Sequence, residues 1–210
     1  MPTAFSFDSP LVEASKKEKL EKVAEEVRSC TRCRLCEGRK NPVVGGGSLD
    51  SPLALIGEAP GRREDELGKP FVGSAGKMLD QVLEKVGIER GEIFITNVVK
   101  CRPPGNRRPR APEIEACSRH MAAILGIVAP KVLAPMGNSS TGYFMKRFGL
   151  RRSSIGDVHG RPFPVEAEWG SVVLFPLYHP AAVLYNRSLE AELLVDFQRL
   201  KELVYGTSSN

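Results

Sequence analysis

Residues 53–61 read Leu-Ala-Leu-Ile-Gly-Glu-Ala-Pro-Gly, and this stretch decides the fold class. Its first four residues are an apolar run typical of a buried strand, and the Gly-Glu-Ala-Pro-Gly segment has the composition of a turn. Helical periodicity follows over residues 74–86 and stops at Gly87. A strand, a turn and a helix in this order predict one unit of an α/β domain.

The same alternation continues along the chain. Residues 93–99 (IFITNVV) are rich in β-branched side chains, which favours a second strand. Further short apolar runs and helical patterns predict two more strands (132–134 and 172–175) and three more helices (112–128, 139–148 and 189–205). An amphipathic helix is also predicted at residues 11–29. Four strand–helix alternations predict a three-layer α/β domain with a mostly parallel sheet.

Each predicted strand has a polar side chain on it or after it: Glu58 after the first, Asn97 on the second, Asn138 after the third and His179 after the fourth. Parallel strands end at one edge of their sheet, where such folds bind ligands. We therefore expect these residues to lie together, although 121 positions separate Glu58 from His179. The turn at residues 57–61 lacks the Gly-Lys-Ser/Thr ending of a phosphate loop, and it is built to present a carboxylate. Taken singly, each residue has a simpler interpretation as a turn or core residue.

Composition is typical of a globular protein: 210 residues, 41% hydrophobic, 26% charged, with a net charge of +5 and five cysteines. This length suits one domain, expected at residues 11–205 with flexible ends at 1–10 and 206–210. Residues 1–10 have no secretory signal, and the apolar stretch 121–130 is too short to span a bilayer. We expect a cytoplasmic protein that does not enter a membrane, with reduced thiols available for metal binding or catalysis.

Cysteine spacing predicts a metal site. Cys30 and Cys33 form a C-x2-C motif, and Cys101 and Cys117 lie 16 positions apart further along. Four thiolates suit zinc or an iron–sulfur cluster, and spacing does not choose between these metals. Cys36 is an alternative third ligand, and the competing interpretation is that each cysteine is an incidental free thiol. A metal bound by all four cysteines would cross-link the N-terminal segment to the middle of the domain.

Basic residues gather in two segments without acids. Residues 100–110 (KCRPPGNRRPR) contain five basic residues, with three prolines and a glycine that indicate a loop. The second cluster consists of Lys146, Arg147, Arg151 and Arg152. We interpret both as phosphate contacts, against the alternative of ordinary solvated surface. Acidic residues lie between Arg62, Arg63 and Lys69, so we expect this segment to produce little net positive electrostatic potential.

Together these segments resemble the iron–sulfur family of uracil-DNA glycosylases, called family 4. The matching stretches are residues 57–61 (GEAPG), 64–65 (ED), 68–76 (GKPFVGSAG), 96–106 (TNVVKCRPPGN) and 179–182 (HPAA). Their order and spacing make the resemblance specific, and it extends from about Cys30 to Val204. The resemblance implies a four-stranded parallel sheet between helices and an enzyme that removes uracil from DNA. We expect this protein to be a monomer.

The resemblance also assigns the cofactor. It implies a [4Fe–4S] cluster held by Cys30, Cys33, Cys101 and Cys117. Cys36 falls where the family does not require cysteine. The partner implied is uracil-containing DNA, duplex or single-stranded, in the nucleoid. A contact between the charged N-terminal region and a replication clamp is a further possibility.

For base recognition, the resemblance implies that Phe71 stacks on a flipped uracil and that Asn97 recognises its polar edge with one amide. Glu64 falls where the family places a side chain against the C5 edge of uracil, which excludes the methyl group of thymine. His179 is implied to donate to the uracil oxygen that gains charge.

Glu58 is implied to position or activate the attacking water, and Glu58 and Ala59 are both counted among the residues expected to bind uracil. Ala59 stands where the better-known single-domain uracil glycosylases carry an aspartate, and the sequence leaves open whether Glu58 acts as a base or only orients water.

DNA contacts are expected from the first basic loop and from the segment after His179. Phosphate contacts are predicted for Lys100, Arg102, Arg107, Arg108 and Arg187. An apolar wedge that fills the gap left by a flipped nucleotide is predicted at Val183 or Leu184, with Tyr185 as a further candidate.

Three other functions are compatible with part of the evidence, namely the fold or the metal site. A uracil-DNA trapping protein would have the fold and metal but no turnover. Related trapping proteins carry a nucleophilic histidine in the basic loop, and here no histidine lies between Cys101 and Cys117. An electron-transfer protein would not need the residues 58, 71, 97 and 179. A zinc-stabilised nucleotide hydrolase would be expected to have a phosphate loop.

Overall fold

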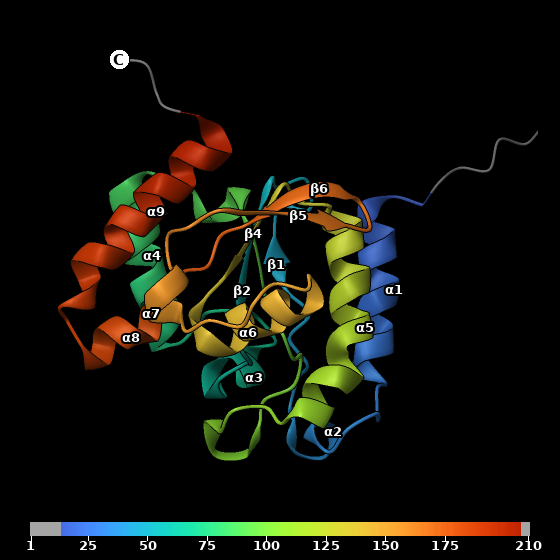
Figure 1. Cartoon of the computed structure of the whole chain (residues 1–210). Helices are drawn as coiled ribbons and strands as arrows, with labels where there is room; N and C mark the ends of the chain where they lie inside the picture. Colours follow the sequence, from blue (N-terminus) through green and yellow to red (C-terminus); the bar gives the residue numbers. More distant parts are fainter. Residues whose placement is uncertain (1–13, 207–210) are drawn as a thin grey trace, which may run out of the picture.

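A computed structural model describes residues 14–206, and in this part of the chain a six-stranded sheet lies between two layers of helices (Figure 1). The strand order is β1-β3-β2-β4-β6-β5. The strands are β1 (Gly46–Gly47), β2 (Leu53–Gly57), β3 (Phe94–Asn97), β4 (Val132–Pro135), β5 (Phe163–Ala167) and β6 (Gly170–Leu174). The predicted α/β class is confirmed.

The central strands β3, β2, β4 and β6 pair in parallel, as predicted. The prediction of four strands was incomplete, because β1 pairs antiparallel with β3 and β5 pairs antiparallel with β6 at the two edges. β1 consists of two glycines, which offer no apolar signal. β5 has no fully buried residue and contains Pro164, so neither strand resembles the buried central ones.

Helices cover both faces of the sheet. One face carries α1 (Lys16–Arg28), α5 (Ala111–Val128), α6 (Gly137–Arg147) and α7 (Ile155–Val158), and the other carries α4 (Ser74–Val86), α8 (Pro180–Tyr185) and α9 (Leu189–Tyr205). Short helices α2 (Leu35–Gly38) and α3 (Arg62–Leu67) and the 3-10 turns η1 (Arg90–Glu92) and η2 (Pro104–Asn106) lie in the connections. Two buried apolar clusters fill the spaces between the layers.

Local signals explain the helix ends. α4 and α9 have the predicted bounds, and α4 stops at Gly87, whose left-handed φ of 66° suits glycine. α1 begins later than expected, because Ser15 and Glu18 form a capping box at its start. α1 packs on α5, where Arg119 and Glu26 form an ion pair of 3.1 Å.

Two predictions about the chain ends fall largely outside the described residues. The flexible segment 1–10 lies before residue 14, and of the predicted tail only Gly206 is described, as the residue that caps α9. Within residues 14–206, no helix combines the length and the apolar character needed to cross a membrane.

Candidate active site

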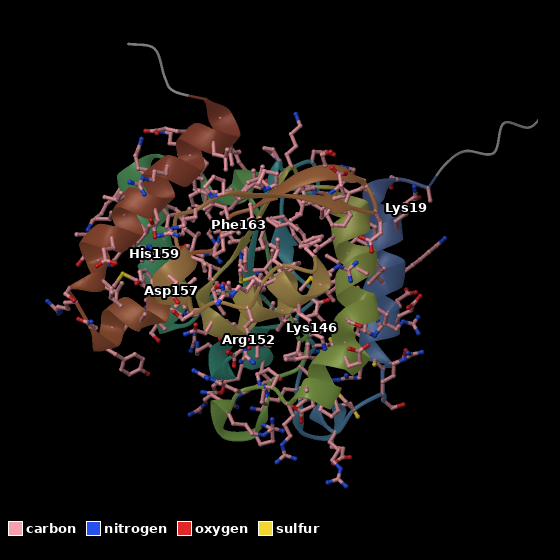
Figure 2. All side chains as sticks on the ribbon, viewed as in Figure 1. Lys19, Lys146, Arg152, Asp157, His159 and Phe163 are labelled. Atoms are coloured by element: carbon pink, nitrogen blue, oxygen red, sulfur yellow. The ribbon has the colours of Figure 1, made fainter. Side chains whose placement is uncertain are left out.

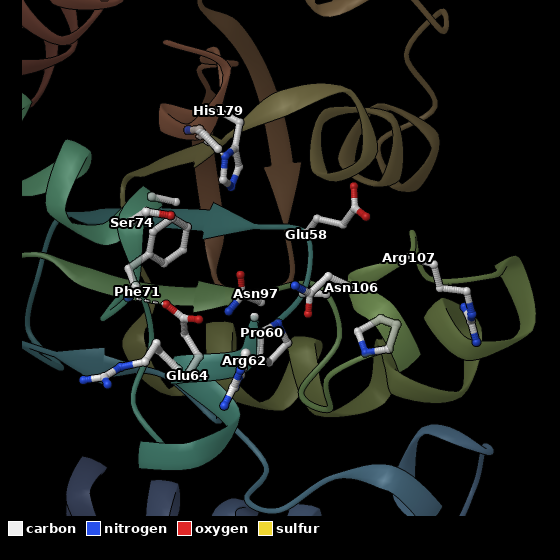
Figure 3. A pocket seen from close by; sticks show the side chains of 17 residues that line it. Glu58, Pro60, Arg62, Glu64, Phe71, Ser74, Asn97, Asn106, Arg107 and His179 are labelled. Atoms are coloured by element: carbon white, nitrogen blue, oxygen red, sulfur yellow. Dashed lines mark hydrogen bonds between the residues drawn. The ribbon is translucent and has the colours of Figure 1, made fainter. Parts of the chain in front are cut away.

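A cavity of about 470 Å³ opens at the carboxyl ends of the parallel strands (Figure 3). Its walls contain every residue predicted to bind uracil or to take part in catalysis: Glu58, Ala59, Glu64, Phe71, Asn97 and His179. Asn97 ends β3 and Glu58 and Ala59 follow β2, while Glu64 lies in α3. Phe71 precedes α4, and His179 lies between β6 and α8. Asn138 is not among the lining residues. Its Oδ1 accepts a hydrogen bond of 2.8 Å from the backbone of Ile155 at the start of α7.

Gly57 brings two of these side chains close to the end of β2. A Cβ atom at Gly57 would lie 2.3 Å from Oδ1 of Asn97 and 2.7 Å from Cζ of Phe71. Real Cβ contacts are never this short, so only glycine permits the observed packing. Asn97 is 2% exposed and Phe71 is 6% exposed. The amide and the ring are therefore held in fixed positions against the backbone of β2.

The backbone of Phe71 is strained and is held from outside. Its φ of 51° is left-handed, which is rare for a bulky side chain and is common at functional sites. The guanidinium of Arg90 donates to the carbonyls of Pro70 (3.0 Å) and Phe71 (2.9 Å). Gly76 in α4 approaches the Phe71 carbonyl so closely that a Cβ would lie 2.0 Å from its oxygen. These contacts fix the ring that lines the cavity.

Glu64 organises the same loop. Its Oε1 accepts hydrogen bonds from the backbone N–H groups of Val72 (2.8 Å) and Gly73 (2.7 Å), and its side chain is 8% exposed. These amides lie at the start of α4, where N–H groups lack helical partners. The carboxylate thus has a structural task that sequence reasoning missed, next to its predicted contact with C5 of uracil.

His179 presents one defined nitrogen to the cavity. Its Nδ1 accepts a hydrogen bond of 3.2 Å from the backbone of Ala181 in α8, so in the neutral ring the proton lies on Nε2. Burial lowers the pKa of His179 to about 4, which makes the ring neutral at pH 7. The ring centroid lies 5.8 Å from that of Phe71. The cavity therefore contains a neutral N–H donor beside an aromatic face.

The side chain of Glu58 is half-buried and lines the cavity (Figure 3). Its backbone carbonyl accepts a hydrogen bond of 3.2 Å from Val99, which ties the turn to the segment after β3. Within residues 14–206 its carboxylate has no hydrogen-bonding partner. Ala59 next to it supplies no polar side chain. Glu58 is therefore a carboxylate whose oxygens are available to a water molecule in the cavity.

The five thiols line a second, smaller cavity between α1, α2 and α5. Cys101 and Cys117 are buried, and Cys30, Cys33 and Cys36 are partly buried. The Arg39 guanidinium donates to Sγ of Cys101 (3.2 Å), and the Lys100 backbone N–H donates to Sγ of Cys117 (3.3 Å). Burial raises the pKa of Cys101 to about 11. Nε2 of His120, which also lines this cavity, is buried without a partner in the described chain.

No three His, Cys, Asp or Glu residues in the described part of the chain form a group able to hold a single metal ion. The thiols nevertheless surround one cavity, and a single ion and a cluster make different demands on the spacing of their ligands. Ligands of one ion must converge on a point, whereas each thiolate of a [4Fe–4S] cluster binds a different iron and the sulfurs stand further apart. The shared cavity and the all-thiol donor set fit a group that four thiolates hold.

Comparison with known proteins decides the family. Residues 44–201 match the family model described as the uracil DNA glycosylase superfamily. The chain belongs to the uracil-DNA glycosylase superfamily. It is 44% identical over 187 residues to the Type-4 uracil-DNA glycosylase of Sulfurisphaera tokodaii, which covers 89% of this chain and 85% of the relative.

Two further relatives extend the similarity beyond one lineage. The Type-4 uracil-DNA glycosylase of Archaeoglobus fulgidus is 40% identical, over 89% of this chain and 94% of its own. That of Thermotoga maritima is 38% identical, over 90% of this chain and 97% of its own. The family resemblance expected from the motifs is confirmed.

The rim of the cavity in this superfamily member is basic. Arg62, Arg63 and Arg107 line it, together with the exposed Ser74 and Asn106. Sequence reasoning discounted Arg63 because acids alternate with it. The structure removes that objection, because the acids of α3 are engaged elsewhere. Glu64 accepts hydrogen bonds from the amides described above. Glu66 pairs with Arg62, and Asp65 accepts a hydrogen bond from the backbone of Lys40, before β1.

The remaining predicted phosphate contacts lie in different surroundings. Arg107 forms a two-pronged ion pair with Glu113 (2.8 and 2.6 Å), and Arg102 donates to Asn106 (2.7 Å). Arg108 and Arg187 are exposed. In the second cluster, Arg147 pairs with Glu168, and Figure 2 shows Lys146 and Arg152 in α6 and in the segment after it.

Lys100 was wrongly predicted to contact phosphate. Its side chain is fully buried (0% exposed), and its Nζ donates to Oγ1 of Thr96 (2.8 Å) and to the carbonyl of Asn97 (2.6 Å). Burial lowers its pKa to about 8, whereas Cys117 and Cys101 raise it. The sequence placed this lysine in a basic run, but packing of β3 against α5 encloses it.

Val183 was also wrongly proposed as a wedge. It is 2% exposed and belongs to the apolar cluster beneath α8. On the same helix Leu184 is 46% exposed and Tyr185 is 91% exposed. The helix turns successive side chains by about 100°, so its neighbours face outward while Val183 faces the core. The wedge candidates are therefore Leu184 and Tyr185.

Proposed function

We propose that this chain hydrolyses the N-glycosidic bond of uracil in DNA, releasing uracil and leaving an abasic site. The observation that carries the proposal is the cavity in which Phe71, Asn97, His179 and Glu58 converge. An aromatic face, an amide, a neutral N–H donor and a free carboxylate are the four groups that the reaction requires. The names of the relatives, Type-4 uracil-DNA glycosylase, support the same activity.

Recognition requires that the uracil leave the base stack, because the reacting sugar carbon is hidden in a duplex. The ring of Phe71 offers a surface on which a flipped base stacks. The amide of Asn97 donates to a uracil carbonyl and accepts from the ring N–H, which distinguishes uracil from cytosine. Because Gly57 fixes both side chains, the cavity is organised before the base enters.

Bond cleavage leaves negative charge on the departing uracil. The Nε2–H of His179 donates to the oxygen on which this charge grows, and a preorganised donor of this kind stabilises the transition state. Because the ring is neutral at pH 7, it donates a hydrogen bond without first being protonated. Electrons of the broken bond between the sugar carbon and the base nitrogen pass to uracil.

Water then completes the hydrolysis at the sugar carbon. The Glu58 carboxylate orients the water and accepts a hydrogen bond from it, while the oxygen adds to the electron-poor carbon. The proton that the water loses balances the one taken up by the uracil anion, so neutral uracil is released. A carboxylate beside this centre also stabilises its positive charge. Ala59 contributes no polar group to this step.

DNA binding uses the basic rim and the exposed end of α8. The proposed phosphate contacts are Arg63, Arg102, Arg107, Arg108 and Arg187. Arg63 and Arg107 line the cavity, Arg102 and Arg108 belong to the same loop as Arg107, and Arg187 follows α8. Leu184 and Tyr185 are proposed to fill the gap left by the flipped nucleotide.

The thiol cavity is proposed to hold a [4Fe–4S] cluster through Cys30, Cys33, Cys101 and Cys117, with Cys36 as a spare thiol. When bound, the cluster supplies a redox-active group and a cross-link between distant segments. It joins the connection before α2 to α5 and to the loop that carries Arg102 and Arg107. An absorbance band near 400 nm with iron and sulfide in the purified protein supports the cluster, and stoichiometric zinc without iron contradicts it.

The remaining proposals concern the setting. We propose a monomer that acts in the cytoplasm on nucleoid DNA. The proposed contact between the N-terminal region and a replication clamp would involve residues 1–13, which lie outside the described residues, or the exposed face of α1.

A uracil-DNA trapping protein is the alternative function. It would need a nucleophile near the sugar carbon, and the loop from Cys101 to Cys117 contains no histidine. Incubation with a uracil-containing duplex separates the two functions. Free uracil in excess of enzyme and an alkali-labile strand support hydrolysis, whereas a covalent protein–DNA adduct at one equivalent supports trapping.

A variant series then assigns the roles. Glu58→Gln should slow the single-turnover rate while binding of the uracil duplex is retained, and Asn97→Ala should lose both. An unchanged single-turnover rate in Glu58→Gln removes Glu58 from the mechanism.

A further inference from the structure

Lys100 is a buried cation that the proposed reaction does not use. No Asp or Glu within residues 14–206 pairs with its ammonium group, which instead donates to Oγ1 of Thr96 and to the carbonyl of Asn97. Thr96 in turn donates to the carbonyl of Val44 (2.6 Å). A buried charge is costly unless an opposite charge lies near it. The carbonyl and hydroxyl acceptors satisfy its protons but do not balance its charge.

The opposite charge lies in the thiol cavity. Lys100 lines this cavity, and its own backbone N–H donates to Sγ of Cys117 at 3.3 Å. Cys101 is its neighbour in sequence and lines the same cavity. Four thiolates carry more negative charge than the positive charge of a core made of four irons and four sulfides, so a loaded site would supply the missing partner charge.

Lys100 therefore touches two sites at once. One end of the residue is bound to a thiol ligand, and the other holds the carbonyl of Asn97, the last residue of β3. The amide of Asn97 is the group that recognises uracil in the proposed reaction. A displacement of this carbonyl moves the amide, which has no free space because it packs against Gly57.

We propose that Lys100 is a positioning residue that links the thiolate-bound cluster to uracil recognition by holding the end of β3. This inference rests on the proposed function, because it takes both the cluster and the role of Asn97 from it. The buried ammonium fixes Asn97, and the negative charge of the loaded thiol site keeps the ammonium in place. The cluster thereby affects which base is bound without contacting the base.

The test compares two variants with a control. Lys100→Met removes the charge and the hydrogen bonds, whereas Lys100→Gln removes the charge and keeps a donor. Lys131→Met changes an exposed lysine before β4 and serves as the matched control. Each is measured for iron and sulfide content, for affinity to a uracil duplex and to the same duplex with thymine, and for the midpoint potential of the cluster.

In Lys100→Met the preference for uracil over thymine duplex should fall about tenfold, as expected for a lost hydrogen bond to a charged group. Affinity for the thymine duplex should be unchanged, because Lys100 is buried. The midpoint potential should shift downward in both Lys100 variants, because a positive charge near the cluster favours its reduced form. Lys100→Gln should recover part of the uracil preference but not the potential.

Two results overturn the inference: a folded Lys100→Met variant with unchanged uracil preference, or unchanged potential in both Lys100 variants. If Lys100→Met does not fold, the binding comparison is made with Thr96→Val instead. This substitution removes one of the three acceptors of the ammonium, which are Oγ1 of Thr96, the carbonyl of Asn97 and Sδ of Met121, so it should lower the uracil preference less. Wild-type protein without iron, or without uracil release, contradicts the proposed function and is seen before any variant is compared.

Discussion

At Gly57, one missing methyl group determines the shape of the proposed uracil site. The glycine contacts the amide of Asn97 and the ring of Phe71, which come from different parts of the chain. Neither side chain has room to move away, because both are buried. Adding a single methyl group at Gly57 should therefore disturb the site, although every polar side chain remains present.

Gly57→Ala should retain the fold and lower kcat/KM for uracil release by about 100-fold, because a misplacement of about 1 Å has this cost in an active site. Gly126→Ala in α5 is the matched control, since a Cβ there meets nothing within 4 Å. Steady-state uracil release and circular dichroism measure the two effects. Equal activity of both variants contradicts the argued packing.

His179 should titrate far below an ordinary histidine. Burial lowers its pKa to about 4 from 6.5, so the unfolded chain binds more protons than the folded chain between these values. Stability from this residue is therefore complete above pH 6.5 and is lost as the pH falls toward 4. Imidazole NMR shifts should show a midpoint near pH 4, and kcat should show no inflection near 6.5 from this ring. A midpoint near 6.5 contradicts the argument that burial lowers the pKa of this ring.

At the scale of elements, the start of α5 depends on an ion pair. Glu113 accepts two hydrogen bonds from Arg107 and one from the Arg110 backbone (2.7 Å), and these lower its pKa to about 2. The depressed pKa means that this stabilisation is present above pH 4.5 and is lost as the pH falls toward 2.

Glu113→Gln should therefore reduce stability at pH 7 and make the urea midpoint less dependent on pH below 4.5. Wild type and variant should approach each other as the pH falls toward 2, because protonation of Glu113 progressively removes its charge. Urea midpoints measured from pH 7 to pH 2 test this, and a constant difference across the range is the contrary result.

Helix α8 separates packing from DNA contact within three consecutive residues. Tyr185→Ala and Leu184→Ala should slow uracil release from duplex more than from single-stranded DNA, because only a duplex leaves a gap to fill. Val183→Ala should instead lower the free energy of unfolding by about 2 kcal/mol, since its methyl groups are buried. Unaltered duplex activity in both exposed variants refutes the wedge.

For the whole molecule, the thiol cavity connects segments that are distant in sequence. Cys117→Ser should lose iron and lower Tm by several degrees, because the cross-link between the N-terminal segment and α5 is lost. Cys36→Ser is the control and should retain iron, since Cys36 is not a proposed ligand. Iron analysis and thermal melts measure both. Loss of iron in Cys36→Ser changes the ligand set.

Sequence periodicity was sufficient for the central elements. The predicted strands at β2 and β3 and the helices α4 and α9 were recognisable because buried elements carry continuous or periodic apolar patterns. Periodicity could not predict β1, because its two glycines pair with β3 through backbone groups alone. Edge strands of this kind depend on a neighbouring strand and not on their own side chains.

The sequence by itself determined the α/β class and the central strands, and its resemblance to a known family pointed to six of the residues that line the cavity. Only the tertiary structure decided the environments of Lys100, Val183 and Arg63. Lys100 and Val183 are buried and Arg63 faces the cavity. The physical reason is that local sequence encodes conformation and average polarity, whereas burial depends on which distant elements pack over a side chain. A lysine in a basic run therefore became an internal link between two sites.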